Sequence, residues 1–292
     1  MRLFFQTSRF IVWVQPSKMA ASTTTEFGVN LTCMKCVRAT ENVLRDVQGI
    51  SKFKVDLDKQ SVVITSTKPT NELQSIIEST GKRAVILGTG LSKDRLDNVN
   101  NLGAAVAMMG GLLGAGKTEG VIRFVQVDSD SCVIDGTIDG LKPLSEHALA
   151  IYECGDISGG CSSVGDHFNP RNGRHGSPET SERHVGDLGN IKTDKFGRAE
   201  FKFSDNLVKV SDIIGRSIAV AEGKDDLGET DHPLSSVNGN CGNLLSCGII
   251  ARSAGLFQNT KRICACDGVT LWEERDKPLV GPGRSDQTSS KF

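Results

Sequence analysis

Cysteine residues are unevenly distributed along the 292-residue chain, and their spacing points to soft-metal chemistry. Two intervals are short: Cys33-Met-Lys-Cys36 forms a C-x-x-C pair, and Cys264-Ala-Cys266 forms a C-x-C pair near the other end. The chain has nine cysteines in all, at positions 33, 36, 132, 154, 161, 241, 247, 264 and 266. Nine are too few for the disulfide scaffold of a small secreted protein. The pattern therefore favours metal or redox use in a reducing compartment.

The C-x-x-C pair is suited to binding one soft metal ion. It follows an expected strand and begins an expected helix, and thiols at a helix N-terminus have lowered pKa values. Two thiolates suit Cu(I), because soft sulfur ligands select it over harder ions. Residues 23–90 contain no further cysteine and no histidine, whereas a zinc site would need two more donors. We predict that Cys33 and Cys36 bind Cu(I); the alternative, a thioredoxin-type redox pair, belongs to a different fold.

The C-x-C pair lies in a polar segment whose end is rich in Pro, Gly, Ser and Lys, a composition typical of disorder. A disulfide between Cys264 and Cys266 would close a small strained ring, so it would be oxidising and readily exchanged. As thiolates, the same residues would bind Cu(I). The alternative interpretation is two cysteines without a function in a C-terminal tail.

Three of the five histidines fall in one long loop together with an aspartate. His167, His175, His184 and Asp187 are separated by seven, eight and two residues. Three neutral imidazoles and one carboxylate make a closed tetrahedral ligand set for Zn(II). The alternative is a chance cluster of polar loop residues.

The elements that must position the C-x-x-C pair lie between residues 23 and about 90. Apolar residues alternate with polar ones over 27–31 and 53–57, and residues 62–64 and 84–87 are also strand-like. Helical spacing occurs over 40–47 and 73–80, and Thr70 is expected to cap the second helix. The order βαββαβ predicts an α+β, ferredoxin-like domain with the cysteine pair in its first loop.

From about residue 100, strand-like segments alternate with Gly, Asp and Asn turns, which predicts an all-β Greek-key barrel or sandwich. Residues 111–118 match the phosphate-binding pattern G-x-x-x-x-G-K-T. That chemistry requires a helix after the motif, but residues 121–127 are strand-like and 104–109 read as their partner strand. We therefore interpret the motif as a hairpin turn and exclude nucleotide binding.

The overall composition excludes several classes of function. The formal net charge is -1, from 34 basic and 35 acidic residues, so no basic nucleic-acid surface is expected. No apolar run reaches the roughly 18 residues of a transmembrane helix, so no membrane insertion is expected. Residues 1–22 are an N-terminal extension: either a basic targeting segment or an untranslated stretch before Met19. The remaining chain divides into residues 23–90, 91–255 and a partly disordered tail of 256–292.

Two parts of the chain resemble known families. Residues 23–90, with C-x-x-C in the first loop, resemble the heavy-metal-associated copper-binding domain, although Leu31 stands where that family usually has Met. The second part resembles copper/zinc superoxide dismutase in a series of motifs: Gly160-Cys161, His167-Phe-Asn-Pro170, Arg183-His184-Val-Gly-Asp-Leu-Gly-Asn190, Ile214-Gly215-Arg216, Asp225-Asp-Leu-Gly228 and Cys247-Gly248. This resemblance implies zinc binding by His167, His175, His184 and Asp187. It also implies a Cys161–Cys247 disulfide, and an Asp225 that orients a zinc histidine.

The chain departs from the dismutase pattern where copper would bind. Ala150, Tyr152 and Ala221 occupy positions of three copper-ligating histidines, and only His167 remains. Leu244 replaces the arginine that guides superoxide. Because alanine offers no lone pair, we predict that the dismutase-like domain lacks a copper site and is not an enzyme.

Together the metal-binding head, the dismutase-like body and the C-x-C tail resemble the family of copper chaperones for superoxide dismutase. The resemblance implies delivery of Cu(I) to that enzyme and formation of its disulfide, through a transient heterodimer that uses Gly248–Ala251. It also implies a copper donor or transporter, cytoplasmic location with the mitochondrial intermembrane space as a second compartment, and a homodimer as an alternative assembly. Cu(I) storage without a client is the alternative function. Cys132 and Cys154 are interpreted as small apolar strand residues, and Cys241 has no assigned role.

Overall fold

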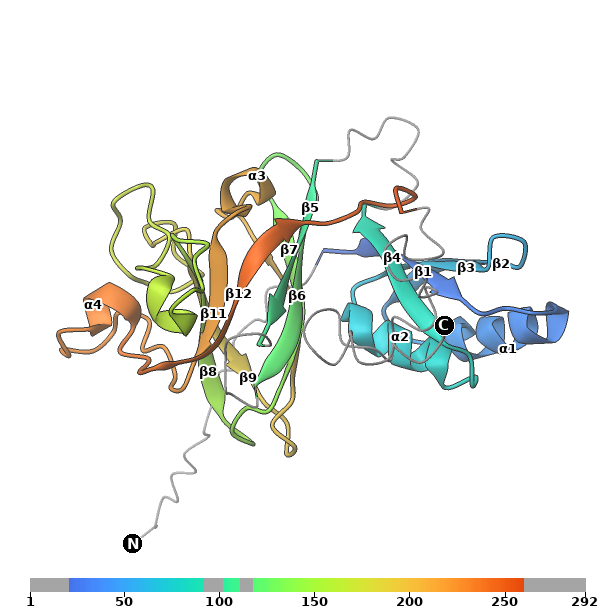
Figure 1. Cartoon of the computed structure of the whole chain (residues 1–292), viewed down its shortest axis with the longest axis horizontal. Coiled ribbons are helices and arrows are strands. Elements are labelled where there is room, and N and C mark those ends of the chain that lie inside the picture. Colours follow the sequence, from blue (N-terminus) through green and yellow to red (C-terminus); the bar gives the residue numbers. More distant parts are fainter. Residues whose placement is uncertain (1–20, 92–101, 111–117, 260–292) are drawn as a thin grey trace, which may run out of the picture.

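The computed structural model describes residues 21–91, 102–110 and 118–259, and Figure 1 shows two lobes side by side. Cys264 and Cys266 lie outside the described residues, as do residues 1–20 and most of the phosphate-binding pattern. Within the described part of the chain, no helix is long and apolar enough to cross a membrane.

The N-terminal lobe is a four-stranded antiparallel sheet with two helices on one face. Its elements are β1 (Thr23–Val29), α1 (Met34–Arg45), β2 (Ile50–Asp56), β3 (Ser61–Ser66), α2 (Thr70–Glu78) and β4 (Ala84–Gly90). The strand order is β2-β3-β1-β4. Phe27, Val62 and Ile64 of the sheet are fully buried against Leu44 of α1 and Ile77 of α2. The predicted βαββαβ fold is confirmed.

The second lobe is an eight-stranded antiparallel barrel. Its strands are β5 (Ala104–Met109), β6 (Glu119–Gln126), β7 (Cys132–Asp139), β8 (Glu146–Tyr152), β9 (Asp187–Lys192), β10 (Ala199–Asp205), β11 (Ser217–Ala221) and β12 (Leu244–Arg252), in the order β10-β7-β6-β5-β12-β11-β8-β9. The terminal strands β9 and β10 contact each other, so the barrel is nearly closed. Short helices α3 (Val210–Ile213) and α4 (Ser235–Asn238) and a 3-10 turn (Gly160–Ser163) lie in its loops.

The strands on either side of the phosphate-binding pattern pair with each other. β5 and β6 are antiparallel, with Met109 opposite Gly120 and Ala104 opposite Val125. A phosphate site of this type needs a helix at that point. The hairpin prediction is confirmed for both flanking strands.

Buried polar contacts join the two lobes. Asp135 of β7 accepts hydrogen bonds from both the N–H and the hydroxyl of Thr70, at the N-terminus of α2. The expectation that Thr70 caps this helix is wrong: Pro69 is the capping residue, and the carboxylate of the barrel serves the free N–H group instead. Lys202 of β10 donates to the Thr23 hydroxyl at 2.7 Å, which adds a second polar contact between the lobes.

Candidate metal sites

The three loop histidines come together because the β8–β9 connection folds back onto the barrel. This connection spans residues 153–186 between Tyr152, which ends β8, and Asp187, which begins β9. His167 forms an isolated bridge with Tyr152, and the Phe168 N–H donates to Ile151 O at 2.8 Å. These backbone bonds hold the loop against β8 and bring its imidazoles to the start of β9.

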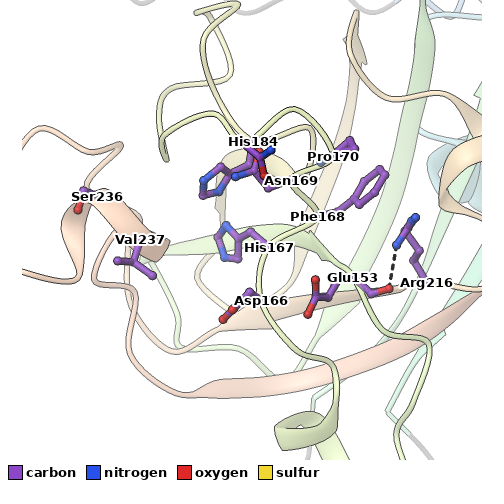
Figure 2. A pocket seen from close by; sticks show the side chains of 11 residues that line it. Glu153, Asp166, His167, Phe168, Asn169, Pro170, His184, Arg216, Ser236 and Val237 are labelled. Carbon is purple, nitrogen blue, oxygen red and sulfur yellow. Dashed lines mark hydrogen bonds between the residues drawn. The ribbon is translucent and has the colours of Figure 1, made fainter.

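The four residues form a buried cluster around one carboxylate oxygen. Their potential ligand atoms all lie within 4.8 Å of one another. Nδ1 of His167, His175 and His184 lies 2.7, 3.0 and 3.3 Å from Oδ1 of Asp187. His167 and His184 also border a hollow of about 570 Å³ on the outside of the cluster, shown in Figure 2 with Glu153 and Arg216 at its other side.

Of the three Nδ1 atoms in this cluster, those of His175 and His184 are buried and have no hydrogen bond within the described chain. A buried polar atom without a partner is costly, so such atoms need an explanation. Both nitrogens face Asp187 Oδ1 without hydrogen-bonding geometry. Ring nitrogens that converge on a carboxylate in this way fit a bound cation, which would displace a proton from each of them, and the nitrogen and oxygen donors suit Zn(II).

The electrostatics of the cluster are those of coupled acids and bases. Burial alone would raise the pKa of Asp187, but the contacting imidazoles of His167, His175 and His184 hold it well below its usual range. Burial lowers the pKa of His175, whereas its interactions with Asp187 and Asp225 outweigh burial and raise that pKa to about 9. The carboxylate is therefore ionised, as a metal ligand must be.

A second layer of contacts fixes the ligands. Asp225 accepts from His175 at Nε2, 2.7 Å away, as the dismutase resemblance implies, and thereby leaves Nδ1 facing Asp187. The side-chain amide of Asn190 holds the backbone of Asp225: it donates to Asp225 O and accepts from Asp225 N–H, both at 2.8 Å. A Cβ at Gly239 (φ +68°) would lie 1.9 Å from Asp225 Oδ1, so only glycine fits beside this pair.

Sequence reasoning missed the buried cation that holds the histidine loop. Arg183 is 2% exposed and donates to the main-chain oxygens of His184 and Asp187 at 3.0 and 2.9 Å. Its guanidinium also pairs with Asp205 of β10. The available signal was an arginine directly before a metal-type histidine, but its partner lies 22 residues away and could not be named from spacing.

A disulfide ties the same loop to the barrel. Cys161 of the 3-10 turn and Cys247 of β12 are bonded, with Cα atoms 5.7 Å apart. The bond closes a loop of 86 residues, and such closure restricts the unfolded chain.

The C-x-x-C pair lies at the beginning of α1 in the other lobe. Sγ of Cys33 and Sγ of Cys36 are 3.6 Å apart, so they face each other as free thiols. Cys33 is exposed and Cys36 is largely buried. The Thr32 hydroxyl lies 3.4 Å from Cys36 Sγ, and hydrogen bonds from Thr32 lower the pKa of Cys36 to about 6. The pair thus offers at least one thiolate at neutral pH, which is the form that binds soft metals.

Comparison with known proteins finds a match for each of the two lobes. The heavy-metal-associated domain matches residues 26–83, and copper/zinc superoxide dismutase matches residues 118–250. The copper chaperone for superoxide dismutase of Rattus norvegicus is 50% identical over 261 residues, covering 89% of this chain and 92% of the relative. That of Homo sapiens is 49% identical over 263 residues, covering 90% and 93%. This chain belongs to the family of copper chaperones for superoxide dismutase.

The barrel alone also resembles the enzyme itself. Superoxide dismutase [Cu-Zn] A of Xenopus laevis is 44% identical over 142 residues, which cover 48% of this chain and 93% of that protein. The resemblance to this enzyme predicts that Ala150, Tyr152 and Ala221 stand where a dismutase has copper-ligating histidines.

Those positions lie in an apolar region next to His167. Ala150, Tyr152 and Ala221 are buried, and the Tyr152 ring meets the His167 ring edge-on with centroids 5.0 Å apart. Two small apolar clusters contain these residues, and Leu244 packs against both. Nε2 of His167 is buried without a hydrogen bond in the described chain.

The remaining described cysteines differ in environment. Cys132 lies in the barrel core, where burial raises its pKa to about 12, so the apolar interpretation of this residue is confirmed. The same interpretation of Cys154 is wrong, because this residue is exposed and follows the end of β8. Cys241 packs with Ala148 and Ala221, and burial raises its pKa to about 11.

Proposed function

We propose that this chain is a metallochaperone that receives Cu(I) on Cys33 and Cys36 and delivers it to copper/zinc superoxide dismutase. The observation that supports this most directly is the division of labour within one chain. An accessible thiol pair stands in one lobe, and a dismutase-like barrel stands in the other. The relatives named copper chaperones for superoxide dismutase share both parts.

In this proposal the thiol pair binds Cu(I) transiently and passes it on. Cu(I) arrives bound to the thiolates of a donor protein, and Cys36 and Cys33 replace those thiolates one at a time. The Cys36 thiolate is already populated near neutral pH, and Cys33 faces solvent. Each exchange forms one Cu–S bond and breaks another, so no electron is transferred. Two-coordinate soft metals move between thiolates in this way without a redox change.

Zn(II) is proposed as the resident metal of the barrel, held by His167, His175, His184 and Asp187. The orphaned Nδ1 atoms of His175 and His184 support this assignment. When bound, the ion supplies structural cross-linking of the loop. Asp225 and Arg183 hold the ligating groups in place from outside the cluster.

We further propose that the barrel has no copper site and no dismutase activity. Ala150 and Ala221 provide no ligand atom, and Leu244 fills the adjacent space with an apolar side chain. Among the positions that the dismutase resemblance assigns to copper, His167 keeps an imidazole, and its Nε2 is buried without a hydrogen bond in the described chain. A single imidazole does not make a copper centre.

The barrel is proposed to recognise the client as a second dismutase subunit would, forming a transient heterodimer. The segment Gly248–Ala251 of β12 lies at the surface involved, and Ile249 is exposed there together with Met108. Isologous surfaces of this type also permit a homodimer, which is the alternative assembly.

Residues 256–292 are proposed as a separate tail, with Cys264 and Cys266 as its reactive pair. In copper transfer they act as thiolates. In disulfide formation the tail disulfide is the oxidant: it accepts two electrons and becomes a dithiol, while the client's two thiols become a disulfide. We place this chemistry in the cytoplasm, with the mitochondrial intermembrane space as a second compartment; the relative from Arabidopsis thaliana is named chloroplastic/cytosolic.

Storage of Cu(I) would use the same cysteines but would give the dismutase-like barrel no role. The experiment that separates the two functions is activation of copper-free, zinc-loaded superoxide dismutase by the Cu(I)-loaded chain, with a copper chelator in excess. We expect activation by the wild type and its loss in Cys264→Ser/Cys266→Ser.

The matched control is Cys154→Ser, which removes an exposed cysteine outside both proposed pairs and should retain activation. Failure of the wild type to activate a client that free Cu(I) does activate would leave storage as the better function.

A further inference from the structure

The chain that leaves the barrel crosses to the N-terminal lobe. After β12, Thr89 N–H donates to Ala254 O at 3.4 Å. A Cβ at Gly88 would lie 2.2 Å from Gly255 O, so the two backbones approach more closely than any side chain allows. The Phe257 N–H then donates to the Glu26 carboxylate at 2.8 Å. The C-terminal tail therefore departs from the four-stranded sheet and not from the barrel.

Phe257 lies at one end of a pocket on the sheet face opposite the helices. Because Phe27 and Ile64 face the helices, their neighbours along each strand face the other way. The pairing of β1, β3 and β2 places two rows of residues on that face. The first row is Thr24, Thr65 and Lys52, and the second is Glu26, Val63 and Lys54. The pocket has a volume of about 110 Å³, and Phe257, Lys59 and Ser61 also line it.

The pocket combines apolar and basic character. Val63 and the ring of Phe257 supply apolar surface, and Phe257 is 47% exposed. Three lysines line it, Lys52, Lys54 and Lys59, against one aspartate, Asp56. The Lys54 side chain is 75% exposed. Lys54 lies 3.9 Å from Asp56, and with three lysines against this one carboxylate the lining of the pocket is positive in sum. Glu26 of β1, next to the lining, directs its carboxylate to the Phe257 N–H.

The tail contains one segment that complements this pocket. Residues Leu271-Trp-Glu-Glu274 combine a large aromatic side chain with two adjacent acids. The nearer segment, Lys261-Arg262, has the same charge as the pocket and is disfavoured there. Trp272 is 15 residues after Phe257, a length that lets the chain leave Phe257 and return to the same face.

We propose that Leu271–Glu274 of the tail dock on the helix-free face of the sheet, with Trp272 against Val63 and Phe257 and the two glutamates beside the lysines of β2. This proposal deepens the chaperone function and rests on it. The tail would then be anchored at both Phe257 and Trp272. Cys264 and Cys266 lie between these anchors and are held close to the thiol pair of the same lobe.

The far end of the pocket is close to that thiol pair. Ser61 and Lys59 border the turn between β2 and β3, and Gln60 of this turn donates to Leu31 O at 3.0 Å, two residues before Cys33. A tethered segment has an effective concentration in the millimolar range, so a contact with a dissociation constant well below about 1 mM is largely formed. Docking thus keeps the two cysteine pairs together until a client arrives.

The test follows Trp272 fluorescence in the full-length, metal-free protein without a client. The chain has one other tryptophan, Trp13, so every protein in the experiment carries Trp13→Phe. We expect Trp272 emission to be blue-shifted, and acrylamide quenching to be about threefold weaker than in the urea-unfolded chain. Lys52→Glu/Lys54→Glu should restore quenching to the unfolded level, as should Glu273→Lys/Glu274→Lys. Combining both pairs of substitutions should restore protection.

The matched control is Lys195→Glu, an exposed lysine on the turn between β9 and β10, which should leave quenching unchanged. Quenching equal to that of the unfolded chain in the unmodified background would overturn the proposal. So would protection that depends on protein concentration, which indicates a second copy, or that arises only after addition of superoxide dismutase. Because no client or copper is present, failure here leaves the activation experiment unaffected.

Discussion

The two proposed metal-binding regions of the chain differ in almost every physical property. The histidine cluster of the barrel is buried, contains one carboxylate and three imidazoles, and is held by Asp225, Arg183 and a disulfide. The thiol pair has two ligands, one of them exposed, and Thr32 is the neighbouring side chain that contacts it. A metal in the first region is costly to remove, whereas a metal in the second can be approached by another thiolate. The contrast separates a resident metal from a cargo metal.

The sharpest way to break the contrast is to remove the support of the buried cluster. Arg183→Ala removes the cation that pairs with the buried Asp205 carboxylate and the donors to the main-chain oxygens of the loop. We expect the free energy of unfolding to fall by about 3–5 kcal/mol. Urea denaturation of the zinc-loaded protein measures this. The control is Arg198→Ala, which breaks the exposed pairs with Asp139 and Glu200 and should cost about 1 kcal/mol or less.

Removal of the resident metal should have the next largest effect. If the free Zn(II) concentration is 100 times the dissociation constant of the site, binding stabilises the folded state by about 3 kcal/mol. A chelator that takes zinc should therefore lower the melting temperature of the wild type and have no effect on His184→Ala. The Cu(I) affinity of the N-terminal thiol pair should stay the same. A chelator effect of equal size in His184→Ala would contradict the assignment of the cluster.

The apolar region next to His167 allows a test of whether the barrel could also accept a copper ligand. Ala221 is 1% exposed and packs with Ala148 and Cys241. Ala221→His overfills this region and buries a polar ring, so the free energy of unfolding of the zinc-loaded, copper-free protein should fall by about 2 kcal/mol. Thermal unfolding of the zinc-loaded protein measures the loss. An unchanged stability would show that the region next to His167 is open enough to admit a copper ligand.

The smallest effect concerns the acidity of the cargo site. The Cys36 thiol, with its pKa lowered to about 6, should be alkylated by iodoacetamide at a rate that rises through pH 6 and levels off above pH 7. Thr32→Val removes the hydroxyl that lies 3.4 Å from Cys36 Sγ. The midpoint should then move up by about one pH unit, because a hydrogen bond to the thiolate favours the charged form.

The alkylation experiment needs a background in which Cys36 is the reacting thiol, so Cys33→Ser is included in both proteins. Thr40→Val, a buried threonine farther along α1, is the matched control and should keep the midpoint near pH 6. An identical midpoint in all three proteins would show that Thr32 does not set the acidity of Cys36.

Local sequence patterns were sufficient to predict most of the secondary structure. Alternating residues such as Phe53 and Val55 predicted strands, because half-buried strands repeat with a period of two. The same reasoning predicted that the segments flanking the phosphate-binding pattern are paired strands, and β5 and β6 do pair. The sequence also indicated that the histidine loop carries a set of metal-ligand side chains, since three imidazoles and a carboxylate at short spacing are rare by chance.

Side-chain environment was less predictable. Cys132 and Cys154 look alike in sequence, yet one lies in the core and the other at the surface. Thr70 has the residue type of a helix cap, but Asp135 of the other lobe takes that role. Neither outcome follows from local pattern, because each depends on which distant segment packs against the residue.

The sequence by itself determined the chemistry of the side chains: which of them are soft or hard ligands, and which carry no ligand atom. Alanine at 150 and 221 cannot bind a metal in any fold. Only the tertiary structure decided which atoms meet. The approach of Nδ1 of His175 to Asp187, the pairing of Arg183 with Asp205, and the crossing of residues 254–257 to the other lobe all join distant positions. Ligand character is a property of one residue, whereas convergence is fixed by packing of the whole chain.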